Sequence, residues 1–443
     1  MLGWNQFLLL LLCVKLVIIH RFVETVDKIV DNVVEEMGMT MTKSDKTGHA
    51  TRLETKRWVV DDRVPRLVDH PAVQEAARRL REGEVVAFPT ETVYGLGANC
   101  FSPAAVQRIF AAKGRPSDNP LIVHIADEAW LNDLVRVVPE TARRLMTAFW
   151  PGPLTLIFPS NGRVAPEVTA GLSTVAVRMP DHPVALALLM ACGVPLAAPS
   201  ANRSGRPSPT RAEHVLDDLD GRIAGVLDGG PVPIGTESTV VDVSGSRPVV
   251  LRPGAISRQA LEEVLQQPVL VASHSTETKE AAVENRSGPE GPQPPDAAPV
   301  ESESVRGAGG YASDVPRSPG MKYTHYAPRG QLWLVDGSPQ AMCERIVREA
   351  LEQLARGKRV GILTTEEHAA RYQQALSGRP VVILPCGRRR DLATVARELY
   401  GCLRRFDDEA VEVIFAEAVP PVGIGEAVMN RLEKASGGRR LRV

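Results

Sequence analysis

A stretch of low complexity divides this chain and limits how it can fold. Residues 273–319 are rich in Glu, Ser, Gly and Pro and poor in aromatic residues. Such a composition buries too little apolar surface to offset the entropy lost on ordering the chain, so we expect a disordered or weakly ordered linker. The 443 residues therefore predict separate folded units on either side of this linker.

The segment before the linker, residues 58–272, alternates short apolar runs with helix-like runs and has no strict repeat. Apolar runs such as Val85–Phe88, Thr174–Arg178 and Val249–Arg252 are typical of buried strands. The amphipathic pattern of His70–Glu82 is typical of a helix. The alternation predicts an α/β domain with a mixed sheet.

The segment after the linker, residues 329–443, predicts a smaller, parallel, Rossmann-like α/β domain. Helix-like patterns separate four runs that resemble buried strands: Leu332–Val335, Val360–Leu363, Val381–Leu384 and Val411–Phe415. Gly423 and Gly425 begin a dinucleotide-binding pattern, but Val428 occupies the place of the third glycine, so this signature is weak.

Residues 1–57 match neither unit. The apolar run Phe7–Ile19 is shorter than a typical membrane-spanning helix, and no Lys or Arg precedes it as in a secretory signal. Three methionines, Met37, Met39 and Met41, are alternative starts. We interpret this segment as an extension that is disordered or results from a misplaced start. A membrane anchor is the alternative.

The composition is that of an ordinary soluble protein, with 44% hydrophobic and 24% charged residues. The formal net charge of −1 gives no bulk attraction to nucleic acid, although a local basic groove remains possible. The six cysteines form no C-x-x-C pair, which argues against a zinc ribbon and a disulfide scaffold and fits a reducing cytoplasm.

Polar turns follow several predicted strands of the first unit, where ligands bind in open α/β sheets. They are Thr90–Tyr94, Lys113–Asn119, Arg178, Ser200–Ser208, and Glu237–Thr239 with Arg252. Lys113 supplies a point charge and Arg115 a planar fork, and together with the other arginines and the hydroxyls they suit an anion with several phosphates. Each arginine alone also fits a surface salt bridge, and each hydroxyl alone fits a turn cap, so the prediction depends on the whole set.

The same turns carry motifs that resemble one enzyme family. The chain is similar to the threonylcarbamoyl-AMP synthases of the YrdC-like superfamily in Pro89–Leu96, Lys113–Pro116, Asn119–Leu121, Pro199–Asn202, Glu237–Val240 and Leu251–Gly254. The island Ser318–Pro328 and the second unit resemble the long, two-domain form of that enzyme. The resemblance covers residues 69–443, interrupted by the linker.

This resemblance implies a fold, a reaction and partners. The fold is a YrdC-like twisted mixed sheet with a concave basic cavity. The reaction converts L-threonine, bicarbonate and ATP, which carries Mg²⁺, into threonylcarbamoyl-AMP and pyrophosphate. Downstream threonylcarbamoyl-transfer proteins would use the product to modify tRNA in the cytoplasm. The family also implies double-stranded RNA binding, which we expect only as a weak tRNA contact, and no membrane association.

The resemblance also implies site residues. Lys113 and Arg115 would be catalytic, through positioning and electrostatics. ATP would contact Lys113, Arg115, Asn119, Thr174, Ser200, Ser208, Arg252 and Tyr326. Threonine would contact Thr92, His124, Arg178, Ala198 and Ser238, with Arg178 binding its carboxylate. Within the linker, 273–328, we expect residues 318–328 to form an ordered lid; a fixed strap that pins the second domain is the alternative.

Two other functions fit parts of the sequence. A basic cavity could bind an RNA backbone without catalysis, but the net charge and the absence of interleaved aromatic residues argue against this. A carbamoyltransferase of the hydrogenase-maturation type shares the superfamily domain, but such enzymes carry paired-cysteine zinc motifs upstream that this chain lacks.

Overall fold

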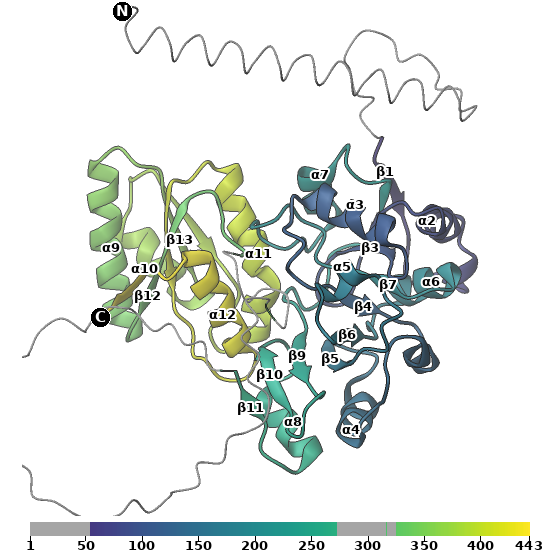
Figure 1. The fold of residues 1–443 in the computed structure, drawn as a ribbon. Helices are drawn as coiled ribbons and strands as arrows, with labels where there is room; N and C mark the ends of the chain where they lie inside the picture. Colours follow the sequence, from purple (N-terminus) through teal and green to yellow (C-terminus); the bar gives the residue numbers. More distant parts are fainter. Residues whose placement is uncertain (1–53, 273–315, 317–324) are drawn as a thin grey trace, which may run out of the picture. The chain divides into compact units, whose positions relative to one another are not determined.

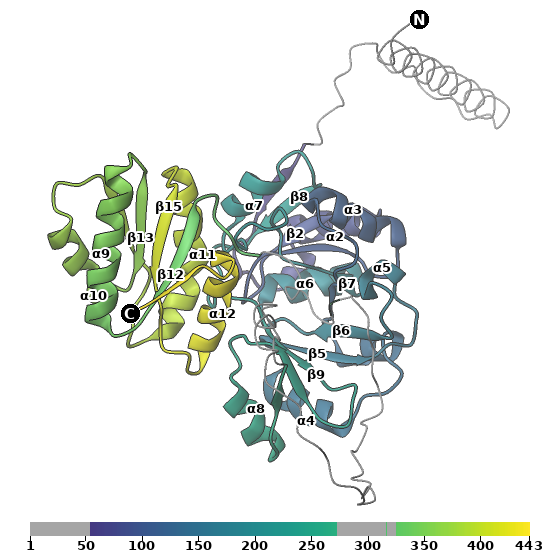
Figure 2. The same ribbon diagram turned by 60° about the vertical axis from the view of Figure 1, so that its left-hand side comes forward.

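The structure is a computed structural model that describes residues 54–272, 316 and 325–443, which fall within one compact unit, residues 53–443. Two sheets, each accompanied by helices, make up the described part of the chain (Figures 1 and 2). Most of the predicted extension and linker, and most of the island Ser318–Pro328, lie outside the described residues. The mixed first sheet and the parallel second sheet confirm the predicted fold class.

The first sheet has eleven strands among the described residues, and parallel and antiparallel pairs occur side by side. In spatial order the strands are β1 (Lys56–Val59), β8 (Gly225–Asp228), β2 (Val86–Phe88), β3 (Gly95–Asn99), β7 (Leu196–Ala197), β4 (Ile122–His124), β6 (Thr174–Arg178), β5 (Leu154–Pro159), β9 (Thr239–Asp242), β10 (Val249–Arg252) and β11 (Leu270–Val271). The accompanying helices are α2 (Pro71–Arg81), α3 (Pro103–Lys113), α4 (Glu140–Phe149), α5 (Pro166–Thr169), α6 (Pro183–Cys192), α7 (Ala212–Leu219) and α8 (Arg258–Leu265), with 3₁₀ turns at Leu67–Asp69 and Glu128–Asp133.

Local sequence fixes both ends of helix α3, which carries the first predicted cation. Ser102 caps the amino end by accepting a hydrogen bond from the backbone N–H of Ala105, and Pro103 occupies the first helical position. Gly114 ends the helix with φ 60°, a left-handed conformation that glycine adopts without strain. Lys113 therefore lies in the last turn, and Arg115 begins the loop that follows.

Two strands differ from the sequence prediction. The sequence analysis assigned no strand to residues 95–99, which form β3. A Cβ at Gly97 would lie only 2.9 Å from the ring of Phe88 on β2, so that glycine permits the close pairing. The predicted extension, 1–57, overlaps β1, which pairs with β8 from Lys56 onward. Lys56 and Arg57 of β1 are exposed on an edge strand, so they do not show the apolar pattern of a buried strand.

The second sheet has five strands, all of them parallel to their neighbours. Their spatial order is β14 (Val381–Pro385), β13 (Val360–Thr364), β15 (Val413–Glu417), β12 (Gln331–Asp336) and β16 (Arg440–Arg442). Helices α9 (Pro339–Ala355) and α10 (Glu366–Ala375) contact each other, as do α11 (Leu392–Asp408) and α12 (Ile424–Ser436), and the two pairs cover opposite faces (Figure 2). Among the described residues, no helix is both long and apolar enough to span a bilayer.

Candidate active site

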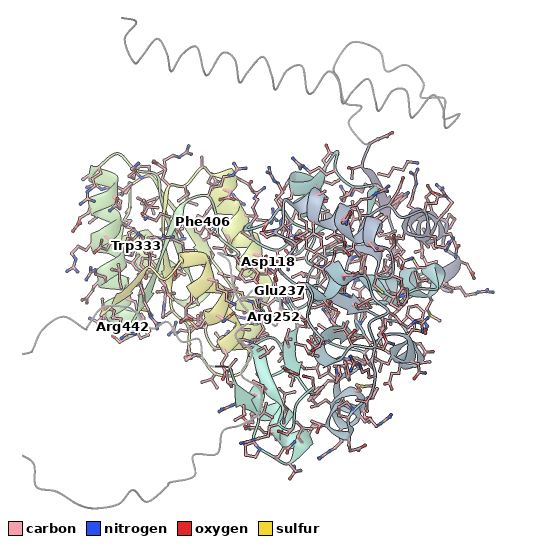
Figure 3. All side chains as sticks on the ribbon, in the orientation of Figure 1. Asp118, Glu237, Arg252, Trp333, Phe406 and Arg442 are labelled. Carbon is pink, nitrogen blue, oxygen red and sulfur yellow. The ribbon has the colours of Figure 1, made fainter. Side chains whose placement is uncertain are left out.

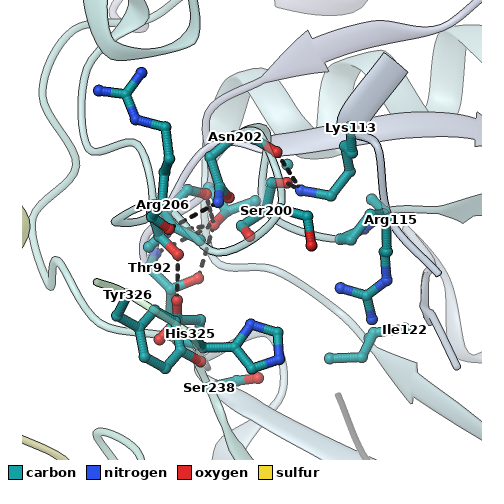
Figure 4. A pocket seen from close by; sticks show the side chains of 18 of the residues that line it. Thr92, Lys113, Arg115, Ile122, Ser200, Asn202, Arg206, Ser238, His325 and Tyr326 are labelled. Atoms are coloured by element: carbon teal, nitrogen blue, oxygen red, sulfur yellow. Dashed lines mark hydrogen bonds between the residues drawn. The ribbon is translucent and has the colours of Figure 1, made fainter. Parts of the chain in front are cut away.

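A cavity in the first sheet brings together polar side chains from segments far apart in the sequence (Figure 4). The loop between β2 and β3, the end of α3, strand β4, the end of β6 and the loop after β7 all contribute to its wall. The start of β9 and the end of β10 complete the wall, together with His325 and Tyr326 from the far end of the linker.

Lys113 and Arg115 are held by backbone carbonyl groups. Lys113 is buried, and its Nζ donates to the carbonyl oxygens of Ser200 and Asn202, each at 2.5 Å (Figure 4). Burial and the neighbouring Arg115 lower the pKa of Lys113 well below its usual value. The Nη2 atom of Arg115 donates to the carbonyl oxygen of Asn119 at 3.3 Å. These contacts orient both cations toward the cavity.

Arg178 lies at the end of β6 within a set of mostly neutral groups. Its Nη1 donates to Oγ1 of Thr92 at 2.8 Å, and its Nε donates to the carbonyl oxygen of Gly152 at 3.2 Å. Its Nη2 lies 2.5 Å from Oε1 of Glu91. Burial and the charge of Arg178 lower the pKa of His124 to about 3, so this imidazole is neutral at pH 7.

Ser238 and Arg252 form the adjoining part of the wall. The Oγ atom of Ser238 and Oγ1 of Thr155 share a hydrogen bond of 2.7 Å. The Nη2 atom of Arg252 donates to the carbonyl oxygen and to Oγ of Ser238, at 3.0 and 3.2 Å. Burial lowers the pKa of Arg252 because it destabilises the charged guanidinium. An anionic ligand would therefore stabilise this guanidinium more than it would stabilise an exposed arginine.

Glu237 connects the cavity to the second domain (Figure 3). Its carboxylate accepts hydrogen bonds from Ser208 at 2.5 Å, from Tyr400 on α11 at 2.8 Å and from Nε of Arg431 on α12 at 3.0 Å. Burial alone would raise the pKa of Glu237, but Arg431 and Arg252, with the two hydroxyl donors, lower it to about 2. This buried carboxylate therefore stays ionised and forms one of several ion pairs between the two domains, beside Arg404–Asp218 and Arg206–Asp407.

The end of the linker lies against the same network. Tyr326 has φ 65° and is buried, with its ring centroid 5.4 Å from that of Tyr400 and 5.6 Å from the guanidinium of Arg431. The backbone N–H of Ala327 donates to the carbonyl oxygen of Gly205 at 2.9 Å. Burial, followed by the charge of Arg115, lowers the pKa of His325 to about 3. Tyr326 and Ala327 together therefore contact both domains at one end of the cavity.

The cavity wall contains most of the residues that the sequence analysis selected. They are Thr92, Lys113, Arg115, His124, Arg178, Ala198, Ser200, Ser208, Ser238, Arg252 and Tyr326. Thr174 opens β6, and Asn119 lies buried in the loop after α3, but neither belongs to the wall. The roles of all the selected residues stay predictions. The predicted lid cannot be compared with the structure, because residues 317–324 lie outside the described part.

Sequence reasoning missed several residues at or beside the site. Asn202, Ser204 and Arg206 join the wall from the loop after β7, and only their place in a polar turn could have indicated them. Glu237, which also belongs to the wall, lies in a motif that the sequence analysis selected, but it was assigned to no substrate. Arg431 lies on the buried face of an amphipathic helix, and no sequence pattern marks it as a partner of a residue nearly two hundred positions earlier.

The described residues contain no group of three or more His, Cys, Asp or Glu side chains arranged to hold a metal ion. The acidic side chain on the cavity wall, Glu237, is already engaged by Arg431, Tyr400 and Ser208. A divalent cation at this cavity would therefore be held mainly by phosphate and water oxygens, as Mg²⁺ bound to a nucleotide is.

Comparisons with known proteins agree with this geometry. The family model described as "Telomere recombination", which covers the Sua5, YciO and YrdC proteins, matches residues 78–254, and the model "Threonylcarbamoyl-AMP synthase, C-terminal domain" matches residues 256–437. A threonylcarbamoyl-AMP synthase of Bacillus subtilis is 50% identical over 88% of this chain and 100% of its own length. Another, of Pyrococcus abyssi, is 42% identical over 84% of this chain and 96% of its own.

Solved structures give the same result. The crystal structure of Sua5 from P. abyssi complexed with L-threonine superposes with a TM-score of 0.73 at 39% identity, covering 88% of this chain and 100% of that one. A variant of the same protein with two substitutions gives the same TM-score at 38% identity over 88% and 98% of the two chains. The chain belongs to the threonylcarbamoyl-AMP synthase family, in its two-domain Sua5 form.

Proposed function

We propose that the cavity binds L-threonine, bicarbonate and ATP and that it forms threonylcarbamoyl-AMP there, the activity of the nucleotidyltransferase family to which the chain belongs. The observation that carries this proposal is the convergence of four cations, Lys113, Arg115, Arg178 and Arg252, on one cavity. The Glu237 carboxylate on the same wall is paired with Arg431 of the second domain.

Threonine is assigned to the part of the cavity around Arg178. The guanidinium suits the substrate carboxylate, and the hydroxyl groups of Thr92 and Ser238 suit its hydroxyl group. His124 is neutral and can exchange a hydrogen bond there without adding charge. Ala198 contributes a small side chain beside them. The P. abyssi protein, whose structure was solved with L-threonine, supports this ligand.

ATP is assigned to the part of the wall around Lys113 and Arg115. Lys113 and Arg115 lie beside the Ser200 loop, where charge-assisted hydrogen bonds to phosphate oxygens are available. The remaining members of the proposed set are Asn119, Thr174, Ser208, Arg252 and Tyr326. Mg²⁺ would enter with the phosphates of ATP and keep several of its waters.

The chemistry explains why such a site needs cations. The neutral amine of threonine bonds to the carbon of bicarbonate, and water leaves. An oxygen of the resulting carbamate then bonds to the α-phosphorus of ATP, and the bond to the bridging oxygen breaks to release pyrophosphate. Two anions must approach each other in this step, so the fixed cations screen their repulsion and stabilise the charge that develops on phosphorus.

The wider setting of the reaction is also part of the proposal. The product would pass to threonylcarbamoyl-transfer proteins that modify tRNA, in the cytoplasm. Direct contact of this chain with tRNA would be weak, because its net charge is −1.

The assay that tests this function is pyrophosphate release with each substrate omitted in turn. We expect release only when threonine, bicarbonate and ATP are all present. A non-catalytic RNA-binding protein would instead give salt-sensitive RNA retention on filters and no threonine-dependent release.

Substrate selectivity gives a second test. Threonine should be preferred over valine by a factor of about 10⁴, because a site built to bond a hydroxyl group leaves buried polar groups unpaired when the hydroxyl is missing. The groups concerned are Thr92, His124 and Ser238. Pyrophosphate release should be measured with each amino acid at matched concentrations. Equal turnover of valine would exclude this placement of the side chain.

A further inference from the structure

Glu91 is a buried acid to which the proposed function gives no role. It lies in the loop between β2 and β3 and is 4% exposed. Its Oε1 is 2.5 Å from Nη2 of Arg178, and neither carboxylate oxygen accepts a well-aligned hydrogen bond from the described residues. Burying a carboxylate is costly, so the charge of Arg178 is what makes this position tolerable for an acid.

The backbone around Glu91 is fixed independently of the side chain. Its carbonyl oxygen accepts the N–H of Ile234 at 3.0 Å, and the carbonyl oxygen of Thr92 accepts the N–H of Gly235 at 3.1 Å. These two bonds attach the loop to the segment before β9. The Glu91 carboxylate that contacts Arg178 is therefore carried by a backbone that is held in place by hydrogen bonds. A side chain can orient its partner only if its own position is fixed.

Arg178 is held at three of its nitrogen atoms by three different segments. Nε and Nη1 contact the neutral acceptors Gly152 and Thr92, and Nη2 contacts Glu91. Of the three contacts, only the one with Glu91 has a charged partner, so Glu91 supplies the counter-charge of the guanidinium. The guanidinium has five N–H groups, so this arrangement fixes its plane and still leaves N–H groups for a ligand.

We propose that Glu91 is a positioning residue that fixes the guanidinium of Arg178 in the orientation that receives the carboxylate of the amino-acid substrate. This inference rests on the proposed function, which assigns that carboxylate to Arg178. Glu91 is absent from the cavity wall, so it acts through Arg178 and not on the substrate itself. Without the acid, the buried guanidinium loses its counter-charge and is free to turn away from the plane that a carboxylate needs.

The test compares Glu91→Gln, which keeps the shape and removes the charge, with Glu91→Asp, which keeps the charge on a shorter side chain. Calorimetric titration with L-threonine and steady-state pyrophosphate release are measured for both. Glu91→Gln should raise the Kd and the KM for threonine at least about tenfold and leave the KM for ATP unchanged. Glu91→Asp should recover part of the threonine affinity. The matched control is Glu84→Gln, which removes a half-buried acid paired with Arg79 outside the cavity.

Arg178→Gln separates failure of this inference from failure of the proposed function. If Arg178→Gln abolishes threonine binding and Glu91→Gln binds threonine like the wild type or more tightly, the positioning role is wrong and the site stands. If Arg178→Gln binds threonine normally, the placement of the substrate carboxylate is wrong. A loss of kcat in Glu91→Gln with unchanged threonine affinity would also overturn the positioning role.

Discussion

Lys113→Met should reduce threonine-dependent pyrophosphate release at least about a hundredfold, because a preorganised charged donor at a reacting phosphoryl group is worth about 10²–10³ in rate. The Nζ atom of Lys113 donates to the carbonyl oxygens of Ser200 and Asn202, and the charged form of this amine has a third N–H for a phosphate oxygen. A bound phosphate anion favours that charged form and opposes the lowering of the pKa by burial. Methionine fills most of the same space, and its burial needs no charge compensation, so the fold should survive. Steady-state kinetics and thermal unfolding check the two parts of this prediction.

The matched control for Lys113→Met is Arg108→Met on the same helix. Arg108 is exposed and donates to the carbonyl oxygen of Gly83, away from the cavity. This control should keep wild-type kinetics, and Arg115→Met should lose activity as Lys113→Met does. Near-normal release by both cavity variants would remove the basis for the phosphate assignment.

Arg431→Met should destabilise the protein by about 3–5 kcal/mol, because it leaves a buried carboxylate without its counter-charge. Arg431 is fully buried, and its partner Glu237 belongs to the cavity wall of the other domain. We therefore also expect lower pyrophosphate release, although Arg431 lies in the C-terminal domain. Urea unfolding measures the stability, and the substrate-dependent assay measures the activity.

The charge of Glu237 gives the Arg431 prediction a pH signature. The pKa of Glu237 falls from 4.5 to about 2 in the folded protein. Because the pKa of Glu237 is lower in the folded protein than in the unfolded protein, the ionised carboxylate stabilises the fold at a pH above about 4.5. That stabilisation is lost as the pH falls from about 4.5 toward about 2. The stability difference between the wild type and Arg431→Met should therefore shrink over this window.

Two further variants isolate the Glu237–Arg431 pair. Arg345→Met removes a more exposed ion pair with Glu349 on α9 and should cost no more than about 1 kcal/mol. The double variant Glu237→Gln/Arg431→Met should be more stable than Arg431→Met alone, because no unpaired buried charge remains. Equal stability of the single and double variants would mean that the pair does not connect the domains energetically.

Sequence patterns predicted the elements that depend on local signals. Helix α3 has its cap, its proline and its terminal glycine within a few residues, and β6 and β10 are short apolar runs with the predicted bounds. Strand β3 was missed because glycine disfavours strands in general, whereas here the ring of Phe88 requires it. The need for glycine at this position comes from a side chain on the neighbouring strand, so the local sequence pattern does not reveal it.

The same distinction applies to the site. Lys113, Arg178 and Arg252 were found because each follows or ends a predicted element next to a polar turn. The partners of Arg178 and of Glu237 could not be found in this way. Glu91 resembles an ordinary turn residue, and Tyr400 and Arg431 resemble other residues of amphipathic helices, because ion pairs between distant segments depend on tertiary packing.

The most direct test of the central claim is mass spectrometry of the product made from L-threonine, ATP and ¹³C-labelled bicarbonate. The proposed function predicts that the wild-type protein forms threonylcarbamoyl-AMP that carries the label, and that Arg178→Gln and Lys113→Met form little or none. ATP turnover without labelled threonylcarbamoyl-AMP, or unchanged labelled product from both variants, would contradict it.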